Sequence, residues 1–260
     1  MKTRTIAVAN QKGGVGKSTT CLNLSHALAE LGYHVLLVDL DPQSSLTISV
    51  GLDLRDLTAT IYDILLETTP GIETKDVIRS TQMNGVDIIP STIDLAKAEM
   101  ELFSEMNRER VLREGLAKVI TPYDYVLIDC PPSLSLLTTN ALAAADSVLI
   151  PLQSDYLAMR GAELLQATID KVRRKLNPDL ALLGVLITMF DSRTSHSRDV
   201  LREVQSAFGH QAFKSVIRYS VRAKESVVTG QSILSYDSRS PLAEAYRALA
   251  NEIIAYAQAA

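Results

Sequence analysis

The chain contains no apolar stretch as long as a membrane span, although apolar residues make up 47% of its 260 residues. Its first apolar run ends at Ala9, which is too short for a secretory signal peptide. Proline, glycine and serine never cluster into a linker, and no internal repeat or low-complexity tract is present. These absences predict a single globular domain over residues 1–260, located in the cytoplasm.

Cysteine is also scarce, since the chain has only Cys21 and Cys130. Their spacing matches neither a metal site nor a disulfide framework. A reducing cytosol fits this usage, and we interpret both residues as small members of the core.

The net charge of −4 conceals an asymmetry between the two halves of the chain. Residues 1–150 hold 12 Lys and Arg against 19 Asp and Glu, whereas residues 151–260 hold 14 against 11. The stretch 190–224 carries seven basic side chains: Arg193, Arg198, Arg202, Lys214, Arg218, Arg222 and Lys224. A locally basic face can bind a polyanion despite an acidic total charge, although a basic solvated surface has the same composition.

Continuous apolar runs alternate with segments of helical periodicity. The apolar runs cover 5–9, 35–38, 125–128, 147–150 and 182–188. Helical stretches fall near 19–31, 57–66, 95–120, 136–145, 158–176, 198–208 and 242–258. Strands without polar residues, separated by helices, indicate an α/β fold: a doubly wound, mostly parallel sheet with helices on both faces. Ligands of such sheets bind beyond the carboxyl ends of the strands.

A glycine-rich segment follows the first apolar run and precedes the first helix. It reads Lys12-Gly13-Gly14-Val15-Gly16-Lys17-Ser18-Thr19. Strand, glycine-rich turn and helix N-terminus together are the context of a phosphate-binding loop. Lys17 is predicted to bind the β- and γ-phosphates of a nucleotide, and the Ser18 hydroxyl to ligate Mg²⁺. The general motif has glycine where this chain has Gln11, and a second lysine, Lys12, stands at the loop entrance.

Carboxylates follow two other apolar runs. Asp39 and Asp41 come after the second run, and Asp129 ends the run at 125–128. A carboxylate at such a strand end can position water or hold Mg²⁺ through water, although it can also cap a helix. When these carboxylates follow a phosphate loop in this order, they strongly indicate a site for a nucleotide and Mg²⁺.

These motifs resemble the deviant Walker A subclass of P-loop NTPases, and within it the ParA/Soj-type partition ATPases of the ParA/MinD superfamily. The matching segments, in the family's order, are 10–19, 38–43, 89–91, 129–133, 139–142 and 189–194. The resemblance implies that Lys12 crosses a dimer interface to the partner's nucleotide, that Asp41 positions the hydrolytic water, and that Asp129 holds Mg²⁺ through water.

The resemblance also implies that Arg193 and Arg222 bind DNA without sequence preference; surface ion pairing is the alternative role. The chain departs from the family near the adenine, where Arg218-Tyr219-Ser220 replaces the common Pro-x-Asn. Adenine recognition is therefore less well predicted than phosphate recognition.

The leading hypothesis is a Mg²⁺-dependent ATPase that organises cargo in space. An ATP-sandwich homodimer binds nucleoid DNA, and a ParB-like or other cargo adaptor stimulates hydrolysis and releases the dimer. The cargo itself, whether chromosome, plasmid or protein compartment, is not predicted by the sequence.

Three alternative functions share some of these sequence features. A MinD-like membrane switch is the first alternative, but the tail 249–260 has no Lys or Arg to attract anionic lipid, so we expect it to cap the core and expect no membrane partner. Electron transfer, as in the nitrogenase iron protein, needs two cysteines placed to share a cluster across a dimer. A DNA-binding module without catalysis leaves Lys12, Lys17, Asp41 and Asp129 unexplained.

Overall fold

One sheet of eight strands organises the described part of the chain. The computed structural model describes residues 2–66, 72–154 and 158–259. The strand order is β3-β4-β2-β5-β1-β6-β7-β8. The strands are β1 (Arg4–Val8), β2 (Val35–Asp39), β3 (Arg79–Ser80), β4 (Val86–Ile89), β5 (Tyr125–Asp129), β6 (Ser147–Gln153), β7 (Ala181–Phe190) and β8 (Ala212–Arg218). All neighbouring strands are parallel except β3 and β4.

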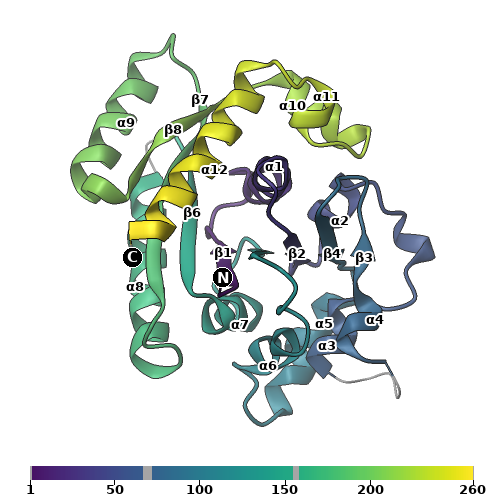
Figure 1. Cartoon of the computed structure of the whole chain (residues 1–260). Coiled ribbons are helices and arrows are strands. Elements are labelled where there is room, and N and C mark those ends of the chain that lie inside the picture. Colours follow the sequence, from purple (N-terminus) through teal and green to yellow (C-terminus); the bar gives the residue numbers. More distant parts are fainter. Residues whose placement is uncertain (1, 67–71, 155–157, 260) are drawn as a thin grey trace.

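Helices cover both faces of this sheet (Figure 1). The α-helices are α1 (Lys17–Glu30), α2 (Ser45–Ser49), α3 (Ile61–Leu66), α4 (Thr74–Val77), α5 (Leu95–Glu101), α6 (Val111–Ala117), α7 (Leu136–Ala144), α8 (Ala158–Lys175), α9 (Ser195–Phe208), α10 (Val221–Val228), α11 (Ile233–Tyr236) and α12 (Pro241–Ala259). Short 3-10 helices are η1 (Leu54–Asp56), η2 (Leu102–Ser104) and η3 (Gly209–Gln211). The predicted doubly wound, mostly parallel α/β fold is confirmed.

The two faces carry separate hydrophobic clusters. Along β1, Ile6 and Val8 pack into the cluster beneath α1 and α12, whereas Ala7 and Ala9 pack into the cluster beneath α3 and α5 to α9. Successive strand side chains point to opposite faces, and each face here is covered by helices. This is why the middle parts of the central strands β1, β2, β5 and β6 are apolar.

The prediction of one helix over 95–120 is wrong. The chain forms α5, η2 and α6 instead, and the break contains Asn107 in the left-handed region at φ 58°. The Arg110 amide donates to the Asn107 carbonyl at 2.7 Å, which closes this turn. Asparagine tolerates the left-handed region better than most residues, so the turn fits the sequence locally.

The C-terminal helix α12 packs on the core, as expected. Tyr246, Leu249 and Ile253 are each 1% exposed or less, within the cluster that also holds α1. Across the described residues, no helix is both long enough and apolar enough to span a membrane.

Candidate nucleotide-binding site

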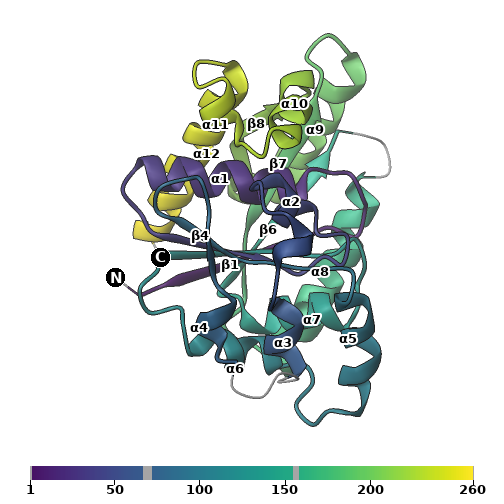
Figure 2. The same cartoon turned by 90° about the vertical axis from the view of Figure 1, so that its right-hand side faces the viewer.

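The connection between β1 and α1 forms an open glycine loop at the carboxyl edge of the sheet (Figure 2). Gly14 and Gly16 lie in the left-handed region, at φ 73° and 86°, where a side chain would be strained. A Cβ placed on either glycine would meet no atom within 4 Å. The backbone of the loop is therefore accessible to a ligand beside the N-terminus of α1, which is the arrangement that binds phosphate.

Two side chains from outside the glycine run pin this loop. Asn10 Nδ2 donates to the Pro151 carbonyl at 2.6 Å, and its Oδ1 accepts from the Lys12 amide at 3.0 Å. Thr188 Oγ1 donates to the Val15 carbonyl at 2.8 Å. The bonds of Asn10 to Pro151 and of Thr188 to Val15 join segments far apart in the sequence, so residue spacing does not predict them.

The two lysines of the loop occupy different environments. Lys17 is 6% exposed, and its Nζ donates to the Lys12 carbonyl at 3.4 Å across the loop. Lys12 is exposed, and its Nζ donates to Gln153 Oε1 at 3.2 Å. Lys17 therefore lies within the loop, whereas the Lys12 side chain contacts the last residue of β6.

A cleft of about 500 Å³ opens in front of the loop. Its lining includes Lys17, Ser18 and Thr19 together with Asp41 and Pro132. This volume lies within the usual range of small-molecule sites. The cleft thus brings together three separate segments that the sequence placed after strand ends.

Asp41 is held at the cleft by a buried polar network. Asp39 is fully buried and accepts from the Asp41 amide at 3.1 Å, from the Thr47 amide at 2.8 Å and from Thr47 Oγ1 at 2.7 Å. Ser91 Oγ donates to the Asp41 carbonyl at 2.9 Å, and its amide donates to Thr47 Oγ1 at the same distance. The two carboxylates therefore have different positions. Asp39 is buried and holds the segment after β2 through its hydrogen bonds to Asp41 and Thr47, whereas Asp41 lines the cleft.

Asp129 ends β5 next to Asp39 in the sheet register. It is fully buried, and among the described residues neither carboxylate oxygen has a hydrogen bond of normal geometry, although the Ser18 hydroxyl is close enough to oppose part of the rise in its pKa. Burial, with the neighbouring Asp39 carboxylate as a further cause, raises the pKa of Asp129 well above its ordinary value. Buried unpaired carboxylate oxygens are costly, and a divalent cation with its water shell would satisfy them. The donor set of Ser18 and Asp129 therefore fits Mg²⁺.

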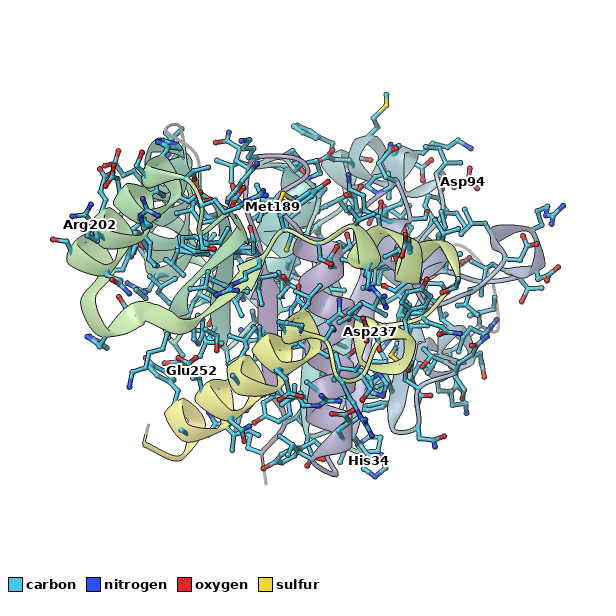
Figure 3. The ribbon with its side chains drawn as sticks, turned by 90° about the horizontal axis from the view of Figure 1, so that it is seen from above. His34, Asp94, Met189, Arg202, Asp237 and Glu252 are labelled. Carbon is cyan, nitrogen blue, oxygen red and sulfur yellow. The ribbon has the colours of Figure 1, made fainter. Side chains whose placement is uncertain are left out.

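A second, largely apolar cavity of about 300 Å³ adjoins the loop on the side of Gly16 and Thr19. The departure from the family motif, Arg218-Tyr219-Ser220, lines it together with Met189. Met189 has a positive φ of 51° and lies beside the N-terminal end of α1 (Figure 3). Its apolar walls, and the residues Gly16, Thr19, Met189 and Val227 that it shares with the phosphate cleft, suit a nucleobase.

Helices α2 and α10 meet at one wall of the site through two glycines. Gly51 and Gly230 follow these helices with φ of 86° and 68°. A Cβ on Gly230 would lie 2.7 Å from the Gly51 Cα. Such a close backbone approach requires glycine, so the pair fixes α10 against α2.

The two arginines predicted to bind DNA both form ion pairs on the surface. Arg193 Nη2 lies 2.7 Å from Asp191 Oδ2, and Arg222 Nη1 lies 2.7 Å from Asp237 Oδ2. Their segments follow β7 and β8, whose last residues are paired in register. Both arginines therefore lie at the same edge of the sheet as the loop, with carboxylates already bound.

Cys21 and Cys130 are both fully buried, in the clusters on opposite faces of the sheet. Neither thiol lies on the surface, where a cluster shared between subunits would require it.

A glycine loop between the first strand and first helix of a parallel sheet, with a buried lysine and acidic strand ends, defines a P-loop nucleotide-binding protein. Residues 3–182 match the family model AAA_31, described as an AAA domain. The sporulation initiation inhibitor protein Soj of Bacillus subtilis is 46% identical over 250 residues, covering 96% of this chain and 98% of that protein. The chromosome partitioning protein ParA of Myxococcus xanthus is 45% identical over 251 residues, covering 96% and 88%.

Solved structures agree with these relatives. A Mycobacterium smegmatis protein described as cobyrinic acid a,c-diamide synthase, with bound ADP and magnesium, matches with a TM-score of 0.86 and 41% identity, covering 98% of this chain and 96% of that one. The septum site-determining protein MinD of Pyrococcus horikoshii, complexed with Mg-ADP, matches with a TM-score of 0.80 and 26% identity, covering 96% of both. The chain belongs to the ParA/Soj branch of the ParA/MinD family of ATPases.

Proposed function

We propose that this ParA/MinD-type ATPase is a DNA-bound, nucleotide-switched dimer that positions or segregates a cargo. The observation that carries the proposal is the contrast between the two loop lysines: Lys17 is buried and lines the cleft, whereas Lys12 is exposed, contacts Gln153 and is not among the described residues that line the cleft. In a dimer, this exposed lysine would contact a nucleotide held by the other subunit.

Hydrolysis would use groups that the cleft brings together. Lys17 and the loop amides would bind the phosphates, while Ser18 and Asp129 would hold Mg²⁺, directly and through water. Bound Mg²⁺ would neutralise developing charge on the phosphates. Asp41 would orient the attacking water, because its carboxylate lines the cleft and Gln43 donates its amide to Asp41 Oδ1 at 2.9 Å.

The nucleotide step is tested with three variants. Lys17→Ala should abolish ATP binding in calorimetry, because a phosphate charge loses its partner. Asp41→Ala should keep ATP binding, lose turnover and accumulate a dimer in size-exclusion chromatography. Lys12→Gln should bind ATP as the parent does but fail to dimerise or hydrolyse. If the Lys12 variant dimerises and hydrolyses normally, its role across the interface is wrong.

DNA binding by the dimer would use Arg193 and Arg222 from both subunits, which doubles the number of phosphates reached. Retention on DNA should therefore require ATP rather than ADP and fall steeply with added salt, through counterion release. Such binding would place the protein on the nucleoid, and an adaptor that stimulates hydrolysis would release it.

The DNA proposal has a matched control in the chain. Arg222→Glu should weaken DNA retention while ATP-dependent dimerisation persists. Arg55→Glu should leave retention unchanged, because Arg55 is also exposed and paired with an aspartate, Asp53, but lies in the acidic half of the chain. Equal retention on DNA with ATP and with ADP, or equal effects of Arg222→Glu and Arg55→Glu, would refute the hypothesis that the dimer binds nucleoid DNA. Binding to anionic vesicles instead of DNA would favour the MinD-like alternative.

A further inference from the structure

The apolar cavity beside the phosphate loop has walls that the core of the protein holds in place. It has a volume of about 300 Å³, and its apolar lining includes Met189, Ile217, Val227, Leu242 and Tyr246. Ile217, Leu242 and Tyr246 are at most 6% exposed, so close packing on the far side fixes their positions. Walls of this kind bind a ring by burying its faces, which does not depend on the polar atoms at the edge of the ring.

The side chains that line this cavity include no group that can only accept a hydrogen bond. Among the described residues of the lining there is no Asp, Glu, Asn or Gln. Thr188 Oγ1 already donates to the Val15 carbonyl at 2.8 Å. The remaining hydroxyls belong to Thr19, Tyr219, Ser220 and Tyr246. Because a hydroxyl can donate or accept, these groups do not distinguish the 6-amino group of adenine from the 6-oxo group of guanine.

Two side chains of the lining carry a positive charge. Arg218 and Lys224 are exposed, and both line the cavity. The carboxylate next to Lys224 in the sequence, Glu225, accepts from the Tyr236 hydroxyl at 3.4 Å and is not part of the lining. Arginine and lysine donate hydrogen bonds and cannot accept them. Guanine presents two neighbouring acceptors, N7 and O6, where adenine presents one acceptor beside a donor, so these cations do not oppose guanine.

Tyr219 supplies an aromatic ring at the open side of the cavity. The residue is 55% exposed, and its amide donates to the Phe190 carbonyl at 3.3 Å, which joins the ends of β7 and β8. Lys224 Nζ lies 5.6 Å from the centre of the ring, within the range of a cation–π contact. An aromatic ring in this position can stack on a base. Stacking tolerates any base, because every base has a π-face.

These contacts together determine how strongly the cavity can select a base. A site that hydrogen-bonds a particular group rejects an analogue without it by about 10⁴- to 10⁵-fold, whereas an apolar pocket discriminates by only about 10- to 200-fold. Arg218, Tyr219 and Lys224 are all exposed, so the base edge beside them would keep contact with water. A mismatched amino or oxo group would therefore avoid most of the cost of burial. The cavity has the features of a weakly selective site.

We propose that this cavity accepts guanine as well as adenine, with Tyr219 as the stacking surface and Lys224 as a donor to the purine edge. The chain would then bind GTP and GDP as well as ATP and ADP. The proposal rests on the nucleotide site at the phosphate loop, and it is independent of the DNA, dimer and cargo parts of the proposed function.

Calorimetric titration of the full chain with the Mg²⁺ complexes of ADP, GDP and CDP tests this proposal. The affinity for GDP should lie within about tenfold of that for ADP, the lower limit of discrimination by an apolar pocket. CDP should bind more weakly than both, because its single ring buries less apolar surface. A larger gap in favour of ADP would refute the proposal, since main-chain groups would then read the base edge. Equal binding of CDP would show that the base does not enter the cavity.

The stacking role of Tyr219 has its own variants. Tyr219→Ala should weaken ADP and GDP by the same factor, about 5- to 150-fold, the usual effect of losing one base-stacking ring. Tyr236→Ala is the control, because Tyr236 is 37% exposed and lies outside the lining. The chain has no tryptophan, so Tyr219→Trp adds a single indole whose fluorescence both nucleotides should quench. Unchanged affinities in Tyr219→Ala, or quenching by ADP alone, would contradict this role.

Lys224→Glu tests the donor at the base edge. The new carboxylate would accept from the amino group of adenine and repel O6 of guanine, so the ratio of GDP to ADP affinity should fall by about fivefold or more, the contribution of one hydrogen bond. Lys214→Glu makes the same change of charge at an exposed position of β8 outside the lining, and should leave the ratio unchanged. An unchanged ratio in Lys224→Glu would refute the role of this lysine.

Failure of this proposal can be told apart from failure of the proposed function. If the parent chain binds ADP but not GDP, base selection is strict and only the present proposal is wrong. If it binds neither nucleotide, the assignment of the phosphate loop is wrong, and the proposed ATPase switch fails with it.

Discussion

Adding one methyl group at Gly230 should separate α10 from α2. The substitution Gly230→Ala should lower the free energy of unfolding for two reasons. An alanine at φ 68° is strained by roughly 1 to 2 kcal/mol. Its Cβ would also lie 2.7 Å from the Gly51 Cα and 3.2 Å from the Gly51 amide nitrogen, so the backbone must move. Overpacking of this kind costs about 1 to 3 kcal/mol.

Gly32→Ala isolates the first cost. Gly32 also follows a helix, has a φ of 87°, and a Cβ placed there would meet nothing within 4 Å. Gly51→Ala should be intermediate, because the nearest atom to its Cβ would be the Gly230 carbonyl oxygen at 3.4 Å. Urea unfolding should therefore rank the losses of stability as Gly230→Ala, then Gly51→Ala, then Gly32→Ala. The first and last should differ by about 1 to 3 kcal/mol.

A second measurement ties this contact to the site. Val227 of α10 lines both cavities, Ala223 of α10 lines the apolar cavity, and Ile48 of α2 lines the cleft. ADP affinity measured by calorimetry should fall in Gly230→Ala and stay unchanged in Gly32→Ala. Equal losses of stability in these two variants would refute the steric argument. Unchanged ADP affinity in Gly230→Ala would show that the contact does not shape the site.

Three further predictions concern charged groups. Lys17→Ala should remove the thermal stabilisation that ADP gives to the parent, measured by calorimetric scanning, because the phosphates lose their buried cation. Asp237→Asn should raise DNA affinity about 1.5- to 5-fold by freeing Arg222 from an exposed ion pair, whose usual strength is about 0.2 to 1 kcal/mol; unchanged retention on DNA would contradict this. Hydrogen bonds from Arg247 lower the pKa of Glu30, so this pair stabilises the fold above the pKa of an unfolded glutamate and is lost as the pH falls through the folded pKa. Glu30→Gln should cost roughly 0.5 kcal/mol at neutral pH and nothing in strong acid, measured by urea unfolding at each pH.

The parts of the fold that could be predicted are those whose side chains meet the same environment on both faces. The runs that became β1, β2, β5, β6 and β7 are apolar because helices cover both sides of the sheet. Strand β8 alternates between buried and exposed residues, so its sequence gives no such run. The break between α5 and α6 depends on the left-handed conformation of Asn107, which hydrophobic periodicity does not register.

The residues of the candidate site also fall into a group that the sequence predicts and a group that it does not. Lys17, Asp41 and Asp129 could be placed at one edge of the sheet because each follows a strand. The residues that hold the site together, such as Ser91 and Thr188, act through hydrogen bonds to segments far along the chain. Spacing along a sequence carries no information about such pairs. The close approach of Gly51 to Gly230 likewise depends on how α2 packs against α10, which the spacing of the two glycines in the sequence does not predict.

The strand order has a consequence for the synthesis of the protein. β1, which leads into the phosphate loop, lies between β5 and β6, so its two neighbours end at Asp129 and Gln153. A ribosome adding about 5 to 20 residues per second needs roughly 7 to 27 s to pass from the loop to the end of β6. Until β5 is complete at Asp129 the apolar strand before the loop has neither of its partners, and the second partner is complete only at Gln153. The first functional segment to be made is thus among the last to become functional, and nucleotide can stabilise the nascent chain only after more than half of it has been translated.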